Sequence, residues 1–155
     1  MKQQPALEAF WSAYLHSLPE QDRNITYYEA FSFGNTPQAA DTILAFVLQG
    51  RKTATSMLLW ELEHKGKTPW HVGDQHIVLD GASNPRCIIQ TTKLRILPFQ
   101  DVDAQFAYDY GEGDQTLAWW RKEMWAYYLE ECKQLGKQAH EDMPLICERF
   151  KLVYP

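Results

Sequence analysis

Apolar residues recur at spacings of three and four along two segments in the first third of the chain, which is typical of one face of an α-helix. In residues 5–18 the apolar positions are Leu7, Phe10, Trp11, Tyr14, Leu15 and Leu18. The second segment begins with Thr36 and Pro37, a capping residue followed by a first-turn proline, and ends at Gly50. We therefore predict two amphipathic helices, of which the second leads almost directly to Lys52.

Strand-like composition follows these helices. Residues 76–79 and 87–97 are rich in Ile, Val and Thr, and the turn-forming residues 80–85 separate them. Near the end of the chain, residues 145–154 alternate between two sets of side chains, as a strand with two unlike faces does. These segments predict three strands.

A longer helical pattern separates the second of these strands from the last. It begins near Asp114, which we expect to cap the helix, and ends at Gly136. Helices and strands thus do not alternate regularly, which disfavours a doubly wound sheet. We predict an α+β fold, a small mixed β-barrel flanked by helices. It forms a single domain over residues 1–155, with the helix of residues 5–18 packed on the barrel.

Composition limits the classes of protein to which this chain can belong. A hydrophobic fraction of 45%, with six Trp, eight Tyr and seven Phe, provides ample apolar surface for a core. The net charge of −5 disfavours binding of long duplex DNA, which uses many Lys and Arg contacts to phosphates. No apolar stretch approaches the ~20 residues that span a bilayer, and the first ten residues lack a signal peptide's apolar region. We expect a cytoplasmic protein without a membrane partner.

The segment from Gly50 to Ser56 combines two cations with three hydroxyl groups. Arg51 and Lys52 can serve the carbonyl end of the preceding helix while the threonines fill a strand. Alternatively, a cation beside a hydroxyl can activate a nucleophile. Lys52 and Thr55 are three residues apart, so on a regular strand they would point to opposite faces and meet only if the backbone turns or bulges. As a base, Lys52 also needs a pKa lowered by burial or by a nearby cation.

A second candidate is Glu112, which lies between Gly111 and Gly113 just before the predicted long helix. Glycines on both sides permit backbone conformations that other residues avoid, and they allow a substrate or another chain to approach closely. The chain has no HExxH, CxxC, GxSxG, GxGxxG or Walker A motif, and its five histidines show no ligand spacing. We therefore expect no metal and no cofactor.

A series of short motifs resembles the ASCH domain, a relative of the PUA RNA-binding barrel. They cover nearly the whole chain: Phe31-Ser32-Phe33-Gly34, Gly50-Arg51-Lys52-Thr53-Ala54-Thr55, Val72-Gly73-Asp74, Ile77-Val78-Leu79-Asp80-Gly81, Gly111-Glu112-Gly113-Asp114 and Cys147-Glu148-Arg149-Phe150. No single motif is specific, but their order and spacing together are. The resemblance implies a PUA-like barrel flanked by helices, with a cleft above the Gly-x-Lys-Thr segment.

Some small members of this family look like amidohydrolases that remove the acyl group from N4-acetylcytidine with a Lys, a Thr and a Glu. The matching residues here are Lys52, Thr55 and Glu112, and the resemblance implies that they are catalytic. Thr55 would attack the acyl carbonyl, or bind it while water attacks. Neutral Lys52 would take the proton, and Glu112 would position Lys52 or the water. The partner would be a modified cytidine nucleoside or single-stranded RNA.

The residues expected to bind the substrate lie around the same cleft, where an aromatic ring can stack on a base: Phe33, Arg51, Thr53 and Trp60. The chain departs from the small amidohydrolases at one position, because Met57 stands where they tend to have an arginine two residues after the threonine. A methionine there predicts more apolar room, for a larger acyl group.

Two other functions would use the same cleft. An RNA-binding module without turnover would contact phosphates through basic side chains and stack an aromatic ring on an unpaired base; the candidates are Arg51, Lys52, Lys93, Arg95 and Arg121. A ribonuclease would cut single-stranded RNA with Lys52 and a nearby hydroxyl or acid. The preferred acyl group and the oligomeric state are left open.

Overall fold

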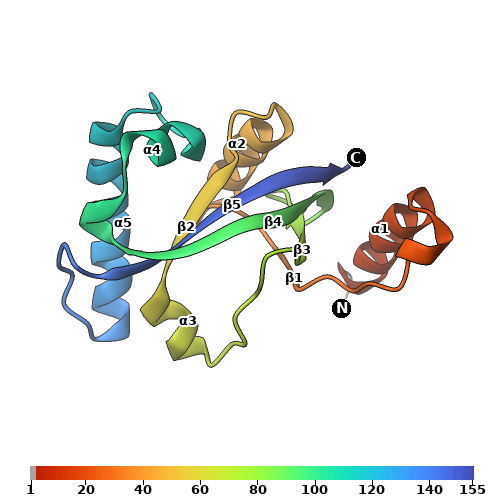
Figure 1. Cartoon of the computed structure of the whole chain (residues 1–155), viewed down its shortest axis with the longest axis horizontal. Helices are drawn as coiled ribbons and strands as arrows, with labels where there is room; N and C mark the ends of the chain where they lie inside the picture. Colours follow the sequence, from red (N-terminus) through yellow and green to blue (C-terminus); the bar gives the residue numbers. More distant parts are fainter. Residues whose placement is uncertain (1–2) are drawn as a thin grey trace.

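The computed structural model describes residues 3–155. Five helices and five strands follow one another along the chain (Figure 1): α1 Gln3–Ser17, β1 Glu29–Phe31, α2 Pro37–Leu48, β2 Ala54–Leu58, α3 Leu59–Lys65, β3 Gln75–Leu79, β4 Pro85–Pro98, α4 Ala104–Tyr110, α5 Leu117–Leu135 and β5 Pro144–Tyr154. Single 3₁₀ turns lie at Glu20–Asp22 and Phe99–Asp101.

The strands form one mixed sheet in the order β1-β3-β4-β5-β2. β1 runs parallel to β3, and the other three pairs are antiparallel. The sheet curves into a half-barrel whose edge strands are β1 and β2, with helices around it. The predicted α+β class, with a mixed barrel-like sheet flanked by helices, is confirmed.

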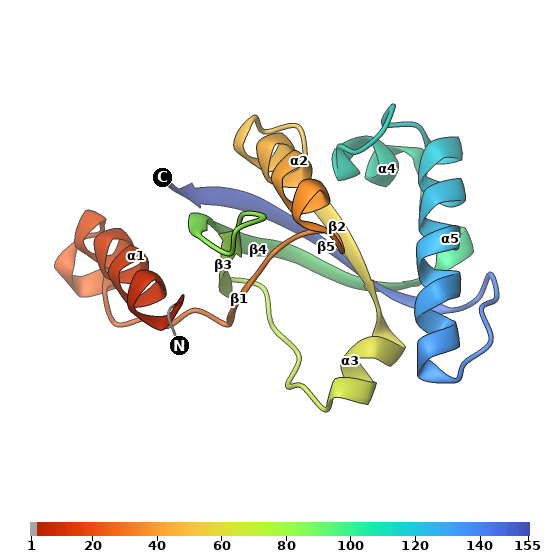
Figure 2. The same cartoon turned by 180° about the vertical axis from the view of Figure 1, so that it is seen from behind.

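Each face of the sheet has its own helices, because side chains alternate along every strand. On one face, α2 packs on β3, β4 and β5 through Leu44 and Val47. On the other face, α4 and α5 cover β2 and the start of β5, whereas α1 covers β3 and β4 through Trp11 and Tyr14. Figures 1 and 2 show α1 and α5 at opposite ends of the sheet.

Most predicted elements match observed ones. The predicted strands correspond to β3, β4 and β5 within two residues at each end. Thr36 caps α2 as predicted, since its hydroxyl accepts a hydrogen bond of 3.0 Å from the Ala39 N–H. Gly50 terminates α2 as predicted: Leu48 is the last helical residue, Gln49 is the C-cap, and Gly50 follows with a φ of 76°.

The long helix begins near Asp114 as predicted, at Leu117, but the predicted cap at Asp114 is wrong. Thr116 is the N-cap of α5, and its hydroxyl accepts a bond of 3.1 Å from the Trp119 N–H. Asp114 instead accepts bonds from the backbone and the hydroxyl of Thr116. Positive φ angles at Gly113 and Gln115 keep the backbone out of the right-handed helical region until the cap is passed.

Candidate functional site

Lys52 lies in the turn between α2 and β2, and its side chain is buried, with the residue 1% exposed. Its Nζ donates hydrogen bonds to the Tyr110 carbonyl at 3.1 Å and to Glu112 Oε2 at 2.8 Å. The same atom lies 3.6 Å from the centroid of the Tyr110 ring. Burial lowers the pKa of Lys52, although the charge of Glu112 acts in the opposite direction. This shift is in the direction that a general base requires.

Two segments that are about sixty residues apart in sequence are bound together here. α4 ends at Gly111, whose φ of 73° is the left-handed conformation that glycine adopts without strain. A Cβ at this position would lie 2.5 Å from the Arg51 carbonyl oxygen and 2.6 Å from the Lys52 Cα, so only glycine fits. Arg51 donates to the carbonyls of Gly111 and Gly113, at 2.6 Å each. These contacts fix the Glu112 loop against Lys52.

Thr55 lies on the face of the sheet that carries α2. β2 begins only at Ala54, so Lys52 precedes the strand and the alternation of strand side chains does not separate it from Thr55. Burial, followed by the charge of Glu112, raises the pKa of Tyr110, against hydrogen bonds from Ser56 and Thr55. The Tyr110 phenol therefore stays protonated and lies near the Thr55 hydroxyl.

A groove of about 660 Å³ runs over this face. Both Thr55 and Glu112 line it, whereas Lys52 lies beneath its surface. Its aromatic lining comes from Phe31, Phe33, Trp70, Tyr110, Trp119 and Tyr127. This size falls in the range of small-molecule sites, and rings of this kind can stack on a planar base.

Two polar residues that were not among the predicted site residues also line the groove, Glu148 and His76, and Thr91 is buried next to them. Glu148 is 6% exposed and accepts a hydrogen bond of 2.5 Å at Oε2 from the Thr91 hydroxyl. His76 Nε2 lies 3.0 Å from the same hydroxyl. Burial raises the pKa of Glu148 to about 7 and lowers the pKa of His76. One sequence signal was available, since Glu148 shares the strand face of the apolar Ile146 and Phe150.

The residues predicted to bind substrate are distributed unevenly. Phe33 lines the groove, with its ring centroid 5.4 Å from Lys52 Nζ. Thr53 and Arg51 instead hold the backbone: the Thr53 N–H donates to the Asp109 carbonyl, and Arg51 to the Gly111 loop. Trp60 lies on α3 and packs against the core under α5, next to His140. Of the four, only Phe33 lines the groove.

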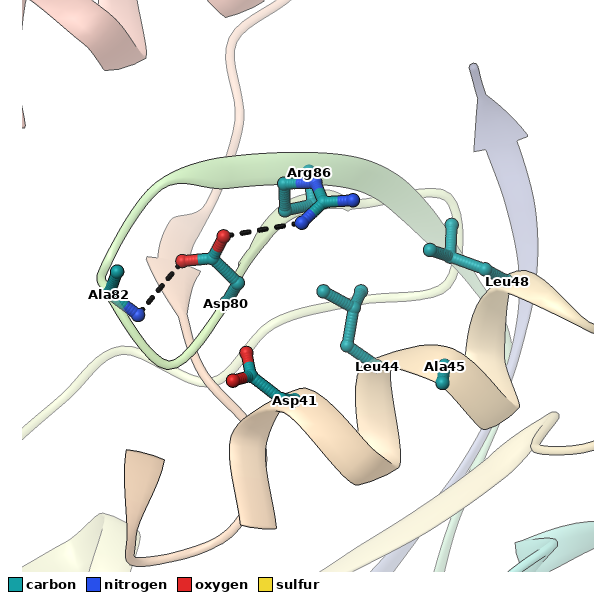
Figure 3. Close-up of a pocket in the computed structure, with 7 residues that line it drawn as sticks. All are labelled: Asp41, Leu44, Ala45, Leu48, Asp80, Ala82 and Arg86. Atoms are coloured by element: carbon teal, nitrogen blue, oxygen red, sulfur yellow. Dashed lines mark hydrogen bonds and ion pairs between the residues drawn. The ribbon is translucent and has the colours of Figure 1, made fainter. Parts of the chain in front are cut away.

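A second hollow, of about 320 Å³, lies between α2 and the turn after β3 (Figure 3). Its polar groups are already paired with the protein. Asp80 accepts bonds from the Ala82 and Asn84 N–H groups and faces Arg86, and Asp41 accepts one from Gly81. These bonds hold the turn after β3 in place, and they leave neither carboxylate unpaired for a ligand. Over residues 3–155, no group of three or more His, Cys, Asp or Glu side chains is placed to hold a metal ion.

These features define an α+β domain with a curved mixed sheet and a buried lysine–carboxylate pair beside an aromatic groove. The family model of the ASCH domain matches residues 29–154. The chain belongs to the ASCH domain family, as its motifs predicted. The family is RNA-binding or hydrolase-like in general. In the part of the chain that the structure describes, no helix is long and apolar enough to cross a membrane.

Two solved structures are similar over almost their whole length. An ASCH domain from Lactobacillus crispatus JV V101 is 31% identical, with a TM-score of 0.92 over 98% of this chain and 96% of that one. A protein from Enterococcus faecalis V583 is 30% identical, with a TM-score of 0.87 over 97% of this chain and 89% of that one. Comparison with curated proteins gave no match.

Proposed function

We propose that this protein is an amidohydrolase that removes an acyl group from the exocyclic nitrogen of an N4-acylated cytosine, with Thr55, Lys52 and Glu112 as catalytic residues. The observation that carries the proposal is the buried lysine of lowered pKa, held by Glu112, under a groove that Thr55 lines. The three positions also match the amidohydrolase members that the sequence resembles.

Lys52 acts as the base and Thr55 as the nucleophile. Neutral Nζ takes the hydroxyl proton as Thr55 Oγ1 bonds to the acyl carbon. Glu112 Oε2, at 2.8 Å from Nζ, holds the amine in place and stabilises the ammonium that forms. The bond between the acyl carbon and the exocyclic nitrogen then breaks, and water later cleaves the acyl-Thr55 ester. Direct attack by water, with Thr55 binding the carbonyl, uses the same residues.

The charge of the groove favours a neutral nucleoside over an RNA strand. Its lining includes six carboxyl groups and two ammonium groups, from Glu29, Glu61, Glu112, Glu123, Glu131, Glu148, Lys65 and Lys67. Because phosphates are attracted to Lys and Arg and repelled by carboxylates, this lining is poorly suited to a nucleic-acid backbone. The aromatic rings remain suited to an uncharged base.

The acyl group would lie against Met57 and Ile146. These residues are cross-strand partners on β2 and β5, and both line the groove. Their side chains offer an apolar surface where an arginine would offer a charge. The acyl pocket therefore favours chains longer than acetyl.

A panel of substrates tests the proposal. Purified protein is incubated with N4-acetyl-, N4-butyryl- and N4-benzoylcytidine, the matching cytosines and a single-stranded RNA oligonucleotide, with chromatographic detection of products. We expect cytidine and the free acid. RNA fragments would show a ribonuclease instead, and salt-sensitive RNA binding without any product would show a binding module. Full activity in both Thr55→Ala and Lys52→Ala would refute the assigned residues.

A further inference from the structure

Four polar side chains form a row across the groove face of the sheet. They come from strands that are neighbours in the order β3-β4-β5-β2: His76, Thr91, Glu148 and Thr55. Thr55 and Glu148 are direct partners in the antiparallel register of β2 and β5. Direct partners have Cβ atoms about 5 Å apart and point to the same face. A substrate amide at Thr55 therefore lies within reach of the Glu148 carboxyl.

The bonds along the row orient this carboxyl. The Thr91 hydroxyl donates a hydrogen bond to Glu148 Oε2. Thr91 Oγ1 is therefore free to accept a hydrogen bond from His76 Nε2, which lies 3.0 Å away. Burial lowers the pKa of His76, which leaves the ring neutral with one N–H to donate. Both the Thr91 bond and the 3.9 Å approach of His76 fall on Oε2. Oε1 is thus the oxygen that remains for a proton and for a ligand.

Burial also sets the protonation of Glu148. It raises the pKa of Glu148 to about 7, and the charge of Glu29 acts in the same direction. The hydrogen bond from Thr91, the nearby Trp70 N–H and the charge of Lys52 act in the opposite direction. A pKa near the working pH is the favourable range for an acid that transfers a proton. The buried Trp70 indole N–H lies close enough to Glu148 to lower its pKa, so it belongs to the surroundings of this carboxyl.

Amide cleavage needs such an acid. The exocyclic nitrogen of cytosine is a poor leaving group as an anion, so a proton must reach the base as the carbon–nitrogen bond breaks. Lys52 takes the Thr55 proton from beneath the groove, where its Nζ is held by the Tyr110 carbonyl and Glu112. We propose that Glu148 is the general acid of the reaction, donating its Oε1 proton to the leaving cytosine nitrogen, with Thr91 and His76 as positioning residues.

The protons balance over one turnover, and this inference rests on the proposed amidohydrolase function. In acylation, Thr55 Oγ1 bonds to the acyl carbon and its proton passes to Lys52. Glu148 protonates the base, which leaves as cytidine. In deacylation, the Glu148 carboxylate takes a proton from water as the water oxygen attacks the ester. The Lys52 ammonium then returns a proton to Thr55 Oγ1, and the carboxylic acid leaves. The net change is amide plus water giving acid plus amine.

Glu148→Gln tests this role, because the amide keeps the shape of the side chain but cannot act as an acid. Two substrates are compared: N4-butyrylcytidine, whose nitrogen needs a proton, and 4-nitrophenyl butyrate, whose phenolate leaves without one. We expect the variant to lose about 100-fold or more in kcat on the amide. On the ester we expect less than about threefold loss in acylation, measured as the first burst of nitrophenolate.

Two further variants complete the experiment. Glu130→Gln removes an exposed carboxyl of α5 that does not line the groove and should keep wild-type rates on both substrates. Thr91→Val keeps the Glu148 carboxyl but removes the bond that orients it, and should give a smaller loss confined to the amide. It also replaces Glu148→Gln if that variant fails to fold. Equal losses on the amide and the ester would refute the general-acid role of Glu148 and leave the proposed amidohydrolase function standing. Inactivity of the wild-type protein on every acylcytidine would refute the proposed function itself.

Discussion

Thr55 on β2 and Glu148 on β5 are direct cross-strand partners on the groove face of the sheet. Thr55 belongs to the motif from which the sequence predicted chemistry, whereas Glu148 belongs to the closing strand, more than ninety residues later. The pairing places the predicted nucleophile beside a buried acid. Variants of the residues around this pair can therefore be chosen to change activity without changing stability.

Lys52→Met should abolish most of the activity while leaving the fold intact. The methionine keeps an apolar stem between the Tyr110 and Phe33 rings but supplies no amine, so we expect kcat on N4-acylcytidine to fall by about 10² to 10⁴. Lys65→Met is the matched control, since this half-exposed lysine lines the groove and pairs with Glu61 alone. Comparable activity in the two variants would exclude Lys52 as the base.

Gly111→Ala should disturb the site more than the strain of its φ angle explains. Alanine at a positive φ costs about 1–2 kcal/mol wherever it occurs. Gly136 provides the control, because it has nearly the same φ, 69° against 73°, with no atom within 4 Å of an added Cβ. Chemical denaturation should show a larger loss of unfolding free energy for Gly111→Ala, and only this variant should lose activity. Equal stability losses would show that the loop can move away from Lys52.

The stability of the protein should depend on pH through Glu148. Its folded-state pKa is raised from 4.5 to about 7, so the folded state holds the proton more tightly than the unfolded state does. This contribution is complete below pH 4.5 and is lost as pH rises through about 7, and it amounts to about 3 kcal/mol. Glu148→Gln lacks this dependence, so its melting temperature relative to wild type should rise between pH 5 and pH 8. A constant difference would show that Glu148 is ionised throughout.

Met57→Arg should shift the choice of acyl group. An arginine at this position would fill and charge the surface that Met57 and Ile146 form, so we expect kcat/KM for butyryl relative to acetyl to fall by about tenfold or more. Met57→Leu keeps an apolar side chain of similar volume and should leave the ratio unchanged. An unchanged ratio in Met57→Arg would place the acyl group elsewhere in the groove.

Long segments with a clear period were predictable from the sequence, and short ones were not. β3 and β4 carry enough Ile, Val and Thr to be found, β5 shows the alternation of a strand, and the Thr36 cap identified the start of α2. β1 has three residues, and α3 and α4 have seven each, too few to show a period. These elements are held by tertiary contacts, such as the parallel pairing of β1 with β3.

The site residues in local motifs were likewise predictable, and those brought together only by tertiary contacts were not. Glycines around Glu112 and the Lys52–Thr55 spacing indicated which segments to examine, and the structure places Lys52 and Glu112 2.8 Å apart. The row of Glu148, Thr91 and His76 depends on the register of three strands, which no local pattern encodes. The sequence also did not predict that Arg51 holds the Glu112 loop, because the carbonyls that it binds are about sixty residues away in the chain.

Tyr110 and Tyr128 both bond to the Ser56 hydroxyl, at 3.3 and 2.6 Å, and both are fully packed in the core under α5. In mechanical terms, this wall of the groove is stiff, because moving it means disrupting the core. The opposite wall consists of the three-residue edge strand β1 and the irregular stretch of residues 66–74 that holds Trp70. Any adjustment to ligands of different size therefore falls on that wall, while the side formed by Tyr110 and β2 keeps its shape.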